Sequence, residues 1–195
     1  MSSGFYLTSK AEKKLNKSFK GKKIAYIITA SVVAEDKEYV KYRKEHMDKL
    51  GWDYEEIDIT GMIEGKLRGV LKNKDIIYVE GGSTFYLLKA IRESGFERIV
   101  KEHLEKGKIY IGSSAGAYVA CPNIMIAVWF NRRHSWDHCG LIEFSGMSLV
   151  PYLIKVHYTK EDDELLKQKR QESDYKIKAL TDKEAILDEY KTYNL

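Results

Sequence analysis

A serine between two glycines carries the strongest chemical signal in the sequence. Ser114 lies in the segment 112–116, GSSAG, which matches G-x-S-x-G and follows the apolar run Ile109–Ile111. In a nucleophile elbow such a serine occupies a strained turn between a strand and a helix, where larger flanking side chains would collide. The pattern predicts that Ser114 is a nucleophile. A phosphate-binding turn, or a turn simply packed from small residues, fits the same pattern when it is taken alone.

Backbone N–H groups near this serine are the expected oxyanion donors. The N–H of Ala115 opens the helix that should follow the turn, which places it to bind the oxyanion of an acyl-transfer intermediate. A second donor is expected from Gly81 and Gly82, because they end another strand and the strand ends of a parallel sheet share one edge. The alternative is that the two glycines only form a tight turn, with Ser83 or Thr84 as the helix N-cap.

A general base must accompany the serine, and the sequence offers five histidines. His46 and His103 fall in amphipathic helices and are expected at the surface, while His134 and His138 lie in an irregular stretch. Only His157 ends a predicted strand. A histidine at the loop edge after the serine can reach the hydroxyl as general base. A purely structural residue at the strand end is the alternative.

The elements around these residues alternate between short apolar runs and longer amphipathic segments. This alternation predicts an α/β fold with a mostly parallel sheet. Strands are expected at Phe5–Thr8, Lys23–Thr29, Tyr54–Ile59, Asp75–Val79, Ile109–Ser113 and Lys155–Tyr158, with a possible terminal hairpin at Lys176–Leu180 and Ala185–Leu187. Helices are expected at Ala11–Ser18, Glu35–Leu50, Met62–Asn73, Ser83–Ser94, Phe96–Lys106 and Glu161–Ser173. Residues 121–153 are expected to be irregular or to form an inserted hairpin.

Composition limits the classes of protein to which the chain can belong. Its 195 residues, 44% of them hydrophobic, predict a single domain over 1–195. The 33 basic and 29 acidic residues are interspersed; the basic stretch Lys10–Lys23 is the best case for nucleic-acid binding, but a solvated helix face is preferred. Cys121 and Cys139 form no disulfide framework or metal pair. Without a signal peptide or an apolar run near ~20 residues, a cytoplasmic protein off the membrane is expected.

The two glycine-containing turns resemble those of peptidase family S51, typified by aspartyl dipeptidase. The resemblance rests on YVEGGSTFYLL at 78–88 and IGSSAGA at 111–117, and it extends through Ala30-Ser31, CPNI at 121–124, His157-Tyr158 and LTDKEAI at 180–186. It implies a three-layer α/β/α sandwich, glutamine-amidotransferase-like with flavodoxin-like topology. It also implies Ser114 as nucleophile, His157 as base, an oxyanion hole from Ala115 and the Gly82 region, a small peptide substrate, no metal or other cofactor, and a monomer or homodimer.

Two positions depart from the family pattern. Ser83 stands where the family usually has asparagine. Similar proteins place the acid of the triad in a strand shortly after Pro122, but residues 115–136 contain no Asp or Glu. We therefore expect the amide of Asn131, or a carboxylate from elsewhere with Asp137 as first candidate, to orient His157. If the specificity also resembles that of aspartyl dipeptidases, a cation must meet the acidic side chain of the substrate, for which the candidates are Arg132, Arg133 and Lys155.

The expected function is therefore that of a serine peptidase resembling aspartyl dipeptidases. A glutaminase-type amidotransferase would need a cysteine at the elbow and a His-x-Glu pair, whereas this chain has Ser114 and Thr159. A cyanophycinase-like hydrolase shares the family but usually has a longer chain. A catalytically impaired binding or regulatory protein, which keeps the pocket without the usual acid, is the alternative from a different class.

Overall fold

A four-stranded parallel sheet organises the larger part of the fold. The computed structural model describes residues 19–35, 37–130 and 139–187. Strands β1 (Lys23–Ile27), β2 (Asp53–Ile57), β3 (Ile76–Val79) and β4 (Ile109–Gly112) lie in the order β2-β1-β3-β4. Each pairing is parallel, and Ile76 of β3 aligns with Ile24 on one side and with Ile109 on the other. This order belongs to doubly wound sheets, in which ligands bind beyond the carboxyl ends of the strands.

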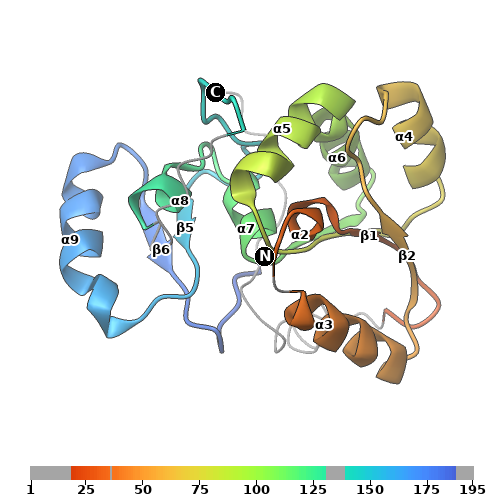
Figure 1. Ribbon diagram of the computed structural model, residues 1–195, viewed down its shortest axis with the longest axis horizontal. Helices are drawn as coiled ribbons and strands as arrows, with labels where there is room; N and C mark the ends of the chain where they lie inside the picture. The colour runs from red at the N-terminus through yellow and green to blue at the C-terminus, as the bar shows by residue number, and fades with distance from the viewer. Residues whose placement is uncertain (1–18, 36, 131–138, 188–195) are drawn as a thin grey trace.

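Helices cover both faces of this sheet. Helix α3 (Glu38–Lys49) lies on one side of β1 and β2, and α4 (Glu64–Leu71), α5 (Thr84–Ser94) and α6 (Phe96–Glu105) lie on the other (Figure 1). Alternate side chains of β1 supply the two cores, because successive residues of a strand point to opposite faces. Ala25 and Ile27 join the core beneath α4–α6, whereas Ile24 and Tyr26 join the core with Met47 of α3. The predicted three-layer α/β architecture is confirmed.

A second parallel pair of strands lies at the other end of the molecule from β2 (Figure 1). It consists of β5 (Leu153–Lys155) and β6 (Ile177–Ala179), joined by the 3₁₀ turn η1 (Lys160–Asp162) and helix α9 (Asp163–Glu172). The predicted terminal hairpin is therefore wrong. Strand β6 pairs in parallel with β5, and Ala185–Leu187 forms no strand. A crossover helix between two strands favours parallel pairing, and α9 is that helix.

Three short helices complete the described part of the chain: α2 (Thr29–Val32), α7 (Ala115–Val119) and α8 (Met125–Trp129). The predicted strand Phe5–Thr8 and helix Ala11–Ser18 lie outside the described residues. In the stretch 121–153 an antiparallel bridge joins Asn123 to Ser145 and α8 adds one short helix, so the described part of this stretch is mostly irregular, as predicted. No helix in the described ranges is both long enough and apolar enough to cross a membrane.

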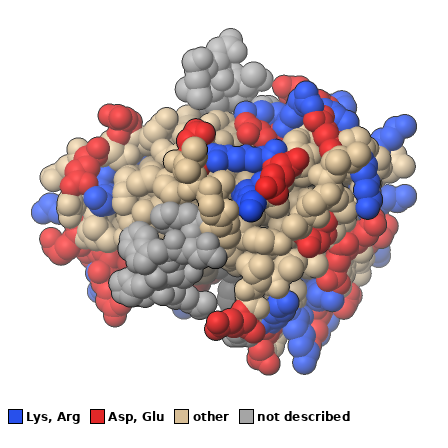
Figure 2. Space-filling view, turned by 45° about the horizontal axis from the view of Figure 1, so that its top comes forward, with Lys and Arg blue, Asp and Glu red and all other residues tan. Residues whose placement is uncertain are grey.

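One predicted surface residue is buried. His103 is only 5% exposed, because it follows Phe96, Ile99 and Val100 on the buried face of α6, at the spacing of a helical stripe. The prediction that His103 lies at the surface is wrong for that reason. Elsewhere, basic and acidic side chains are mixed over the face of the molecule shown in Figure 2.

Candidate active site

Ser114 occupies the sharp turn between β4 and α7. Its backbone has φ 49° and ψ −105°, a strained conformation for a residue with a side chain. Two hydrogen bonds hold the turn: the N–H of Ser113 donates to the carbonyl of Val79 at 2.9 Å, and the N–H of Gly116 donates to the carbonyl of Ser113 at 2.8 Å. The strand thus ends abruptly and presents the hydroxyl of Ser114 at the carboxyl edge of the sheet.

The two glycines that flank this serine leave no space for a side chain. A Cβ on Gly112 would lie 2.4 Å from the carbonyl oxygen of Gly116, and a Cβ on Gly116 would lie 2.4 Å from that of Val79. Such contacts are far shorter than van der Waals separation, so strand β3, strand β4 and helix α7 approach this closely only with glycine at both positions. The G-x-S-x-G pattern therefore has a steric cause in this chain.

His157 follows β5 and points its ring at the serine. Its Nε2 lies 2.9 Å from Oγ of Ser114. Its backbone has φ 54°, so both members of the pair are among the four non-glycine residues with positive φ in the described ranges. Strained backbone conformations cluster at functional sites, so the contact between these two residues makes this place the candidate active site.

Lys155 holds the backbone at the strained residue His157 by hydrogen bonds. Its Nζ donates to the carbonyls of Val156 at 2.8 Å and His157 at 3.3 Å, and it pairs with Asp162 at 3.2 Å. Lys155 and Asp162 are both 4% exposed. Lys155 was one of three candidate cations for an acidic substrate side chain, and this candidate is wrong, because its charge is buried and neutralised by Asp162.

Asp182 completes a chain of hydrogen bonds through the histidine. Its Oδ1 lies 2.6 Å from Nδ1 of His157. A carboxylate only accepts hydrogen bonds, so Nδ1 carries the ring proton and Nε2 keeps a lone pair for the hydroxyl of Ser114. A local turn fixes Asp182, because the carboxylate of Glu184 accepts from both the N–H and the hydroxyl of Thr181.

The parallel pairing of β5 and β6 explains why Asp182 and His157 meet. Lys155 is aligned with Ala179, and the N–H of Tyr158 donates to the carbonyl of Leu180 at 3.0 Å. The chain therefore leaves both strands at the same edge. Asp182 was not among the acids expected from the sequence, although the segment 180–186 carries part of the family resemblance. The available signal was a carboxylate just beyond a short apolar strand.

The turn at Gly81 and Gly82, which follows β3, lies against the nucleophile turn around Ser114. A Cβ on Gly81 would lie 2.9 Å from Cβ of Ser114, so the end of β3 touches the nucleophile turn. The N–H groups of Ala115 and Gly82 have no hydrogen-bond partner among the described residues. The side-chain oxygen of Ser83 accepts from the N–H of Tyr86 at 3.3 Å, so Ser83 is the N-cap of α5. This confirms Ser83 rather than Thr84 as the cap.

Three of the predicted site residues fall in the stretch 131–138. Asn131, Arg132 and Asp137 lie there, together with Arg133, outside the described residues. The structure brings together Ser114 and His157 and joins Asp182 to them. Among the described residues, no group of three or more His, Cys, Asp or Glu side chains is arranged to hold a metal ion.

A thiol does not substitute for the serine at this edge. Cys121 is 1% exposed, and burial raises the pKa of its thiol to about 12. A thiolate is the reactive form of cysteine, so this residue is inert at neutral pH. The glutaminase-type alternative therefore gains no support from Cys121.

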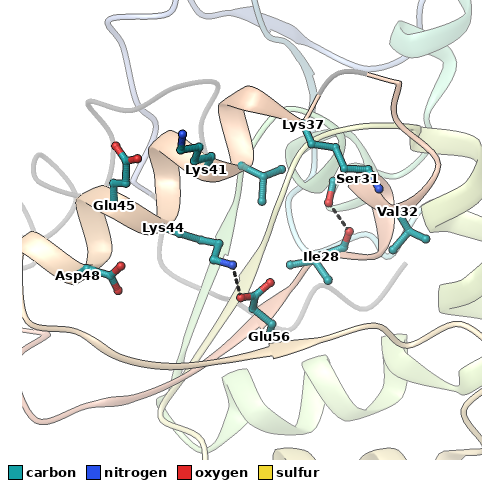
Figure 3. A pocket seen from close by; sticks show the side chains of 10 residues that line it. Ile28, Ser31, Val32, Lys37, Lys41, Lys44, Glu45, Asp48 and Glu56 are labelled. Carbon is teal, nitrogen blue, oxygen red and sulfur yellow. Dashed lines mark hydrogen bonds and ion pairs between the residues drawn. The ribbon is translucent and has the colours of Figure 1, made fainter.

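A hollow of about 430 Å³ lies apart from this chain of residues, between α2 and α3 (Figure 3). Ser114, His157 and Asp182 are not among its lining residues. Lys44 and Glu56 point toward each other across it and form an ion pair at 2.6 Å. Because the hollow does not include the residues that contact one another at the carboxyl edge of the sheet, the candidate site remains the edge that carries Ser114.

Comparison with known proteins decides the family. Residues 2–194 match peptidase family S51. The chain belongs to peptidase family S51. This S51 chain is 33% identical to an uncharacterized peptidase of Listeria monocytogenes over 152 residues, which are 78% of this chain and 73% of that protein. It is 30% identical to peptidase E of a Nostoc species over 71% of this chain and 53% of that protein.

Solved structures agree with this assignment. The S51 chain superposes on the crystal structure of a Listeria monocytogenes protein provisionally named peptidase E, with a TM-score of 0.80 and 30% identity. The match covers 93% of this chain and 88% of that one. A peptidase from an actinobacterium shares the fold at a TM-score of 0.58 and 18% identity, over 85% of this chain and 68% of that one.

Proposed function

We propose that this S51 peptidase is a serine hydrolase that cleaves small peptides, with Ser114 as nucleophile, His157 as general base and Asp182 as the acid that orients the histidine. The observation that carries the proposal is the unbroken series of contacts from Asp182 to Nδ1 of His157 and from Nε2 to Oγ of Ser114, at 2.6 and 2.9 Å. A hydroxyl, an imidazole and a carboxylate in this order activate a serine for acyl transfer.

In the first half of the proposed reaction, Oγ of Ser114 bonds to the carbonyl carbon of the scissile peptide while its proton passes to Nε2 of His157. The carboxylate of Asp182 stabilises the imidazolium that forms. The carbonyl oxygen becomes an oxyanion, which accepts hydrogen bonds from the N–H groups of Ala115 and Gly82. The carbon–nitrogen bond then breaks, and the leaving amine takes the proton from Nε2.

In the second half, water replaces the amine. A water molecule gives a proton to Nε2 of His157 and its oxygen bonds to the acyl carbon. The ester bond to Ser114 breaks, Oγ takes back the proton, and the free carboxylic acid leaves. Half of the His157 side chain (49%) and 67% of that of Asp182 are exposed, so water reaches the pair without any movement of the fold.

The substrate class follows from the family resemblance of the sequence. Aspartyl dipeptidases typify family S51, and the segments that carry the resemblance include both turns of this site, at 78–88 and 111–117. We propose dipeptides and other short peptides as substrates, with an acidic first residue preferred. Arg132 and Arg133, which lie outside the described residues, are the candidate cations for that acidic side chain.

Labelling with a fluorophosphonate tests the nucleophile. An activated Oγ forms a bond to phosphorus, fluoride leaves, and the hydroxyl proton passes to His157. We expect one adduct, on Ser114, and none in Ser114→Ala, with Ser148→Ala as a matched control that keeps labelling. Ser148 is another serine with positive φ. An adduct that persists in Ser114→Ala would remove Ser114 from the mechanism.

Hydrolysis tests the reaction class separately. Dipeptides that begin with Asp, Asn or Ala, and the matching chromogenic amides, should be cleaved by the wild-type chain and not by Ser114→Ala. Preference for Asp over Asn would support an acidic substrate, and equal rates would contradict it. Labelling of Ser114 without cleavage of any short peptide would leave a reactive serine but refute the small-peptide proposal.

A further inference from the structure

A buried carboxylate, that of Glu80, immediately precedes the turn at Gly81 and Gly82. Glu80 is 1% exposed and accepts three hydrogen bonds: from the hydroxyl of Tyr26 at 2.7 Å, from Nε of Arg43 at 3.1 Å and from the N–H of Gly81 at 2.8 Å. A buried charge is tolerated only when it is paired and hydrogen-bonded in this way. One of the three donors is the backbone of the turn itself, so Glu80 anchors the peptide that precedes Gly81.

Helix α3 holds the next peptide. The hydroxyl of Tyr39, in the first turn of α3, donates to the carbonyl oxygen of Gly81 at 3.2 Å. This oxygen and the N–H of Gly82 belong to one peptide group. Because a trans peptide is planar, its oxygen and its N–H point in opposite directions. The hydrogen bond from Tyr39 therefore also sets the direction of the Gly82 N–H, away from Tyr39.

Contacts with Ala30 also fix the Gly81–Gly82 peptide, on the side that leads to Ser83. Gly82 has φ 139°, and a Cβ there would lie 2.0 Å from the carbonyl oxygen of Ala30. The N–H of Ser83 donates to that same oxygen at 2.8 Å. Glycine is the residue least able to hold one backbone conformation by itself, so the two successive glycines depend on these outside contacts.

Arg43 connects Glu80 to the nucleophile turn around Ser114. Its Nε pairs with Glu80, and its Nη2 lies 3.4 Å from Oγ of Ser113, the residue before the nucleophile. Its guanidinium also lies over the ring of Tyr78, 5.6 Å from the centroid. Arg43 is only 6% exposed. A single buried ion pair thus touches both turns that the proposed oxyanion hole requires.

We infer that Tyr39 is a positioning residue, which together with the Arg43–Glu80 pair holds the Gly81–Gly82 peptide so that the N–H of Gly82 faces the developing oxyanion. The inference rests on the proposed function, because it concerns the oxyanion hole of that same reaction. Tyr39 acts through the backbone and exchanges no proton with the substrate. The first turn of α3 thereby contributes to the transition state, although neither the serine nor the histidine lies on that helix.

The substitution Tyr39→Phe removes one oxygen and keeps the ring. We expect kcat to fall about tenfold with KM unchanged, since a misdirected oxyanion donor weakens the transition state and not substrate binding. Affinity for a peptide aldehyde, whose carbon bonds to Oγ of Ser114 and whose oxygen then occupies the hole, should fall by the same factor. Tyr42→Phe is the matched control on α3, because 59% of Tyr42 is exposed, and it should match the wild type.

The other outcomes separate this inference from the proposed function. Wild-type kinetics in Tyr39→Phe, with Ser114→Ala inactive, would overturn the inference and leave the function standing. A raised KM with unchanged kcat would make Tyr39 a substrate contact and also overturn it. Wild-type protein that hydrolyses no peptide would overturn the function and the inference with it. Glu80→Gln keeps an acceptor for the N–H of Gly81 but loses the charge, and a folded variant should show the same loss in kcat.

Discussion

Asp182 and His157 meet through a 2.6 Å contact although they are 25 positions apart in the sequence. Each residue lies just beyond one strand of a parallel pair, and α9 separates the two strands in the chain. Their meeting is therefore a property of the register between β5 and β6. The Thr181–Glu184 turn then aims the carboxylate at the ring.

Replacing Asp182 with asparagine tests its proposed role. The amide keeps the size of the side chain but cannot stabilise an imidazolium by its charge, and it can leave His157 in the wrong tautomer. We expect kcat to fall by roughly 10²- to 10⁴-fold with little change in KM. Asp174→Asn is a suitable control, because Asp174 is exposed and follows α9 rather than β6. Unchanged kcat in Asp182→Asn would show that another group orients the ring.

The sequence predicts those parts of the site that depend on residues close together in the chain, namely the turn around Ser114 and the strand end at His157. The turn around Ser114 is read from five consecutive residues, because its close approaches at Gly112 and Gly116 demand glycine. His157 could be predicted because only this histidine ends an apolar strand. Most strands and helices were placed within a few residues for the same reason, since their buried faces repeat with the period of the element.

The proposed acid, Asp182, could not be predicted in this way. Its identity depends on which strand pairs with β5, and an apolar run such as Ile177–Ala179 does not specify its partner or its direction. The apolar pattern indicated instead a possible hairpin of Lys176–Leu180 with Ala185–Leu187, which gives no reason for Asp182 to meet His157. The resemblance to the family places the acid shortly after Pro122, so Asn131, or a carboxylate from elsewhere with Asp137 as first candidate, was expected instead. Burial of His103 and of Lys155 was missed for a related reason, because each polar residue lies among apolar ones on a packed face.

Lys155→Met should destabilise the fold and weaken the site together. The substitution leaves the buried carboxylate of Asp162 without its cation and removes the donor to the carbonyl of His157. Loss of one partner of a buried pair costs about 3–5 kcal/mol of unfolding free energy. Urea denaturation measures this loss, with the exposed Lys167→Met of α9 as a control. Adding Asp162→Asn should restore part of the stability, and no recovery would contradict the ion-pair explanation.

Gly116→Ala and Gly69→Ala should change stability in opposite directions. At Gly116 the added methyl group would lie 2.4 Å from the carbonyl oxygen of Val79, within the contact between β3 and the nucleophile turn. We expect a loss of at least about 2 kcal/mol, with hydrolysis abolished. Gly69 lies within α4 with no atom within 4 Å of the new methyl group, so helix propensity should add about 0.5–1 kcal/mol. Thermal unfolding of both variants checks the pair, and equal shifts would contradict the steric argument.

His103 should make the fold sensitive to mild acid. Burial lowers the pKa of His103 to about 4, aided by the positive charge of Lys108, whereas the unfolded chain has the ordinary value near 6.5. Between these values the unfolded state binds more protons than the native state, so unfolding free energy falls as pH falls from 6.5 toward 4. The contribution of this residue should reach about 2 kcal/mol at pH 5 relative to pH 7.5. Urea denaturation at both pH values, in the wild type and in His103→Gln, measures it. The variant should lose about 2 kcal/mol less than the wild type on acidification, because glutamine does not titrate, and parallel losses in the two proteins would show that His103 is not protonated on unfolding.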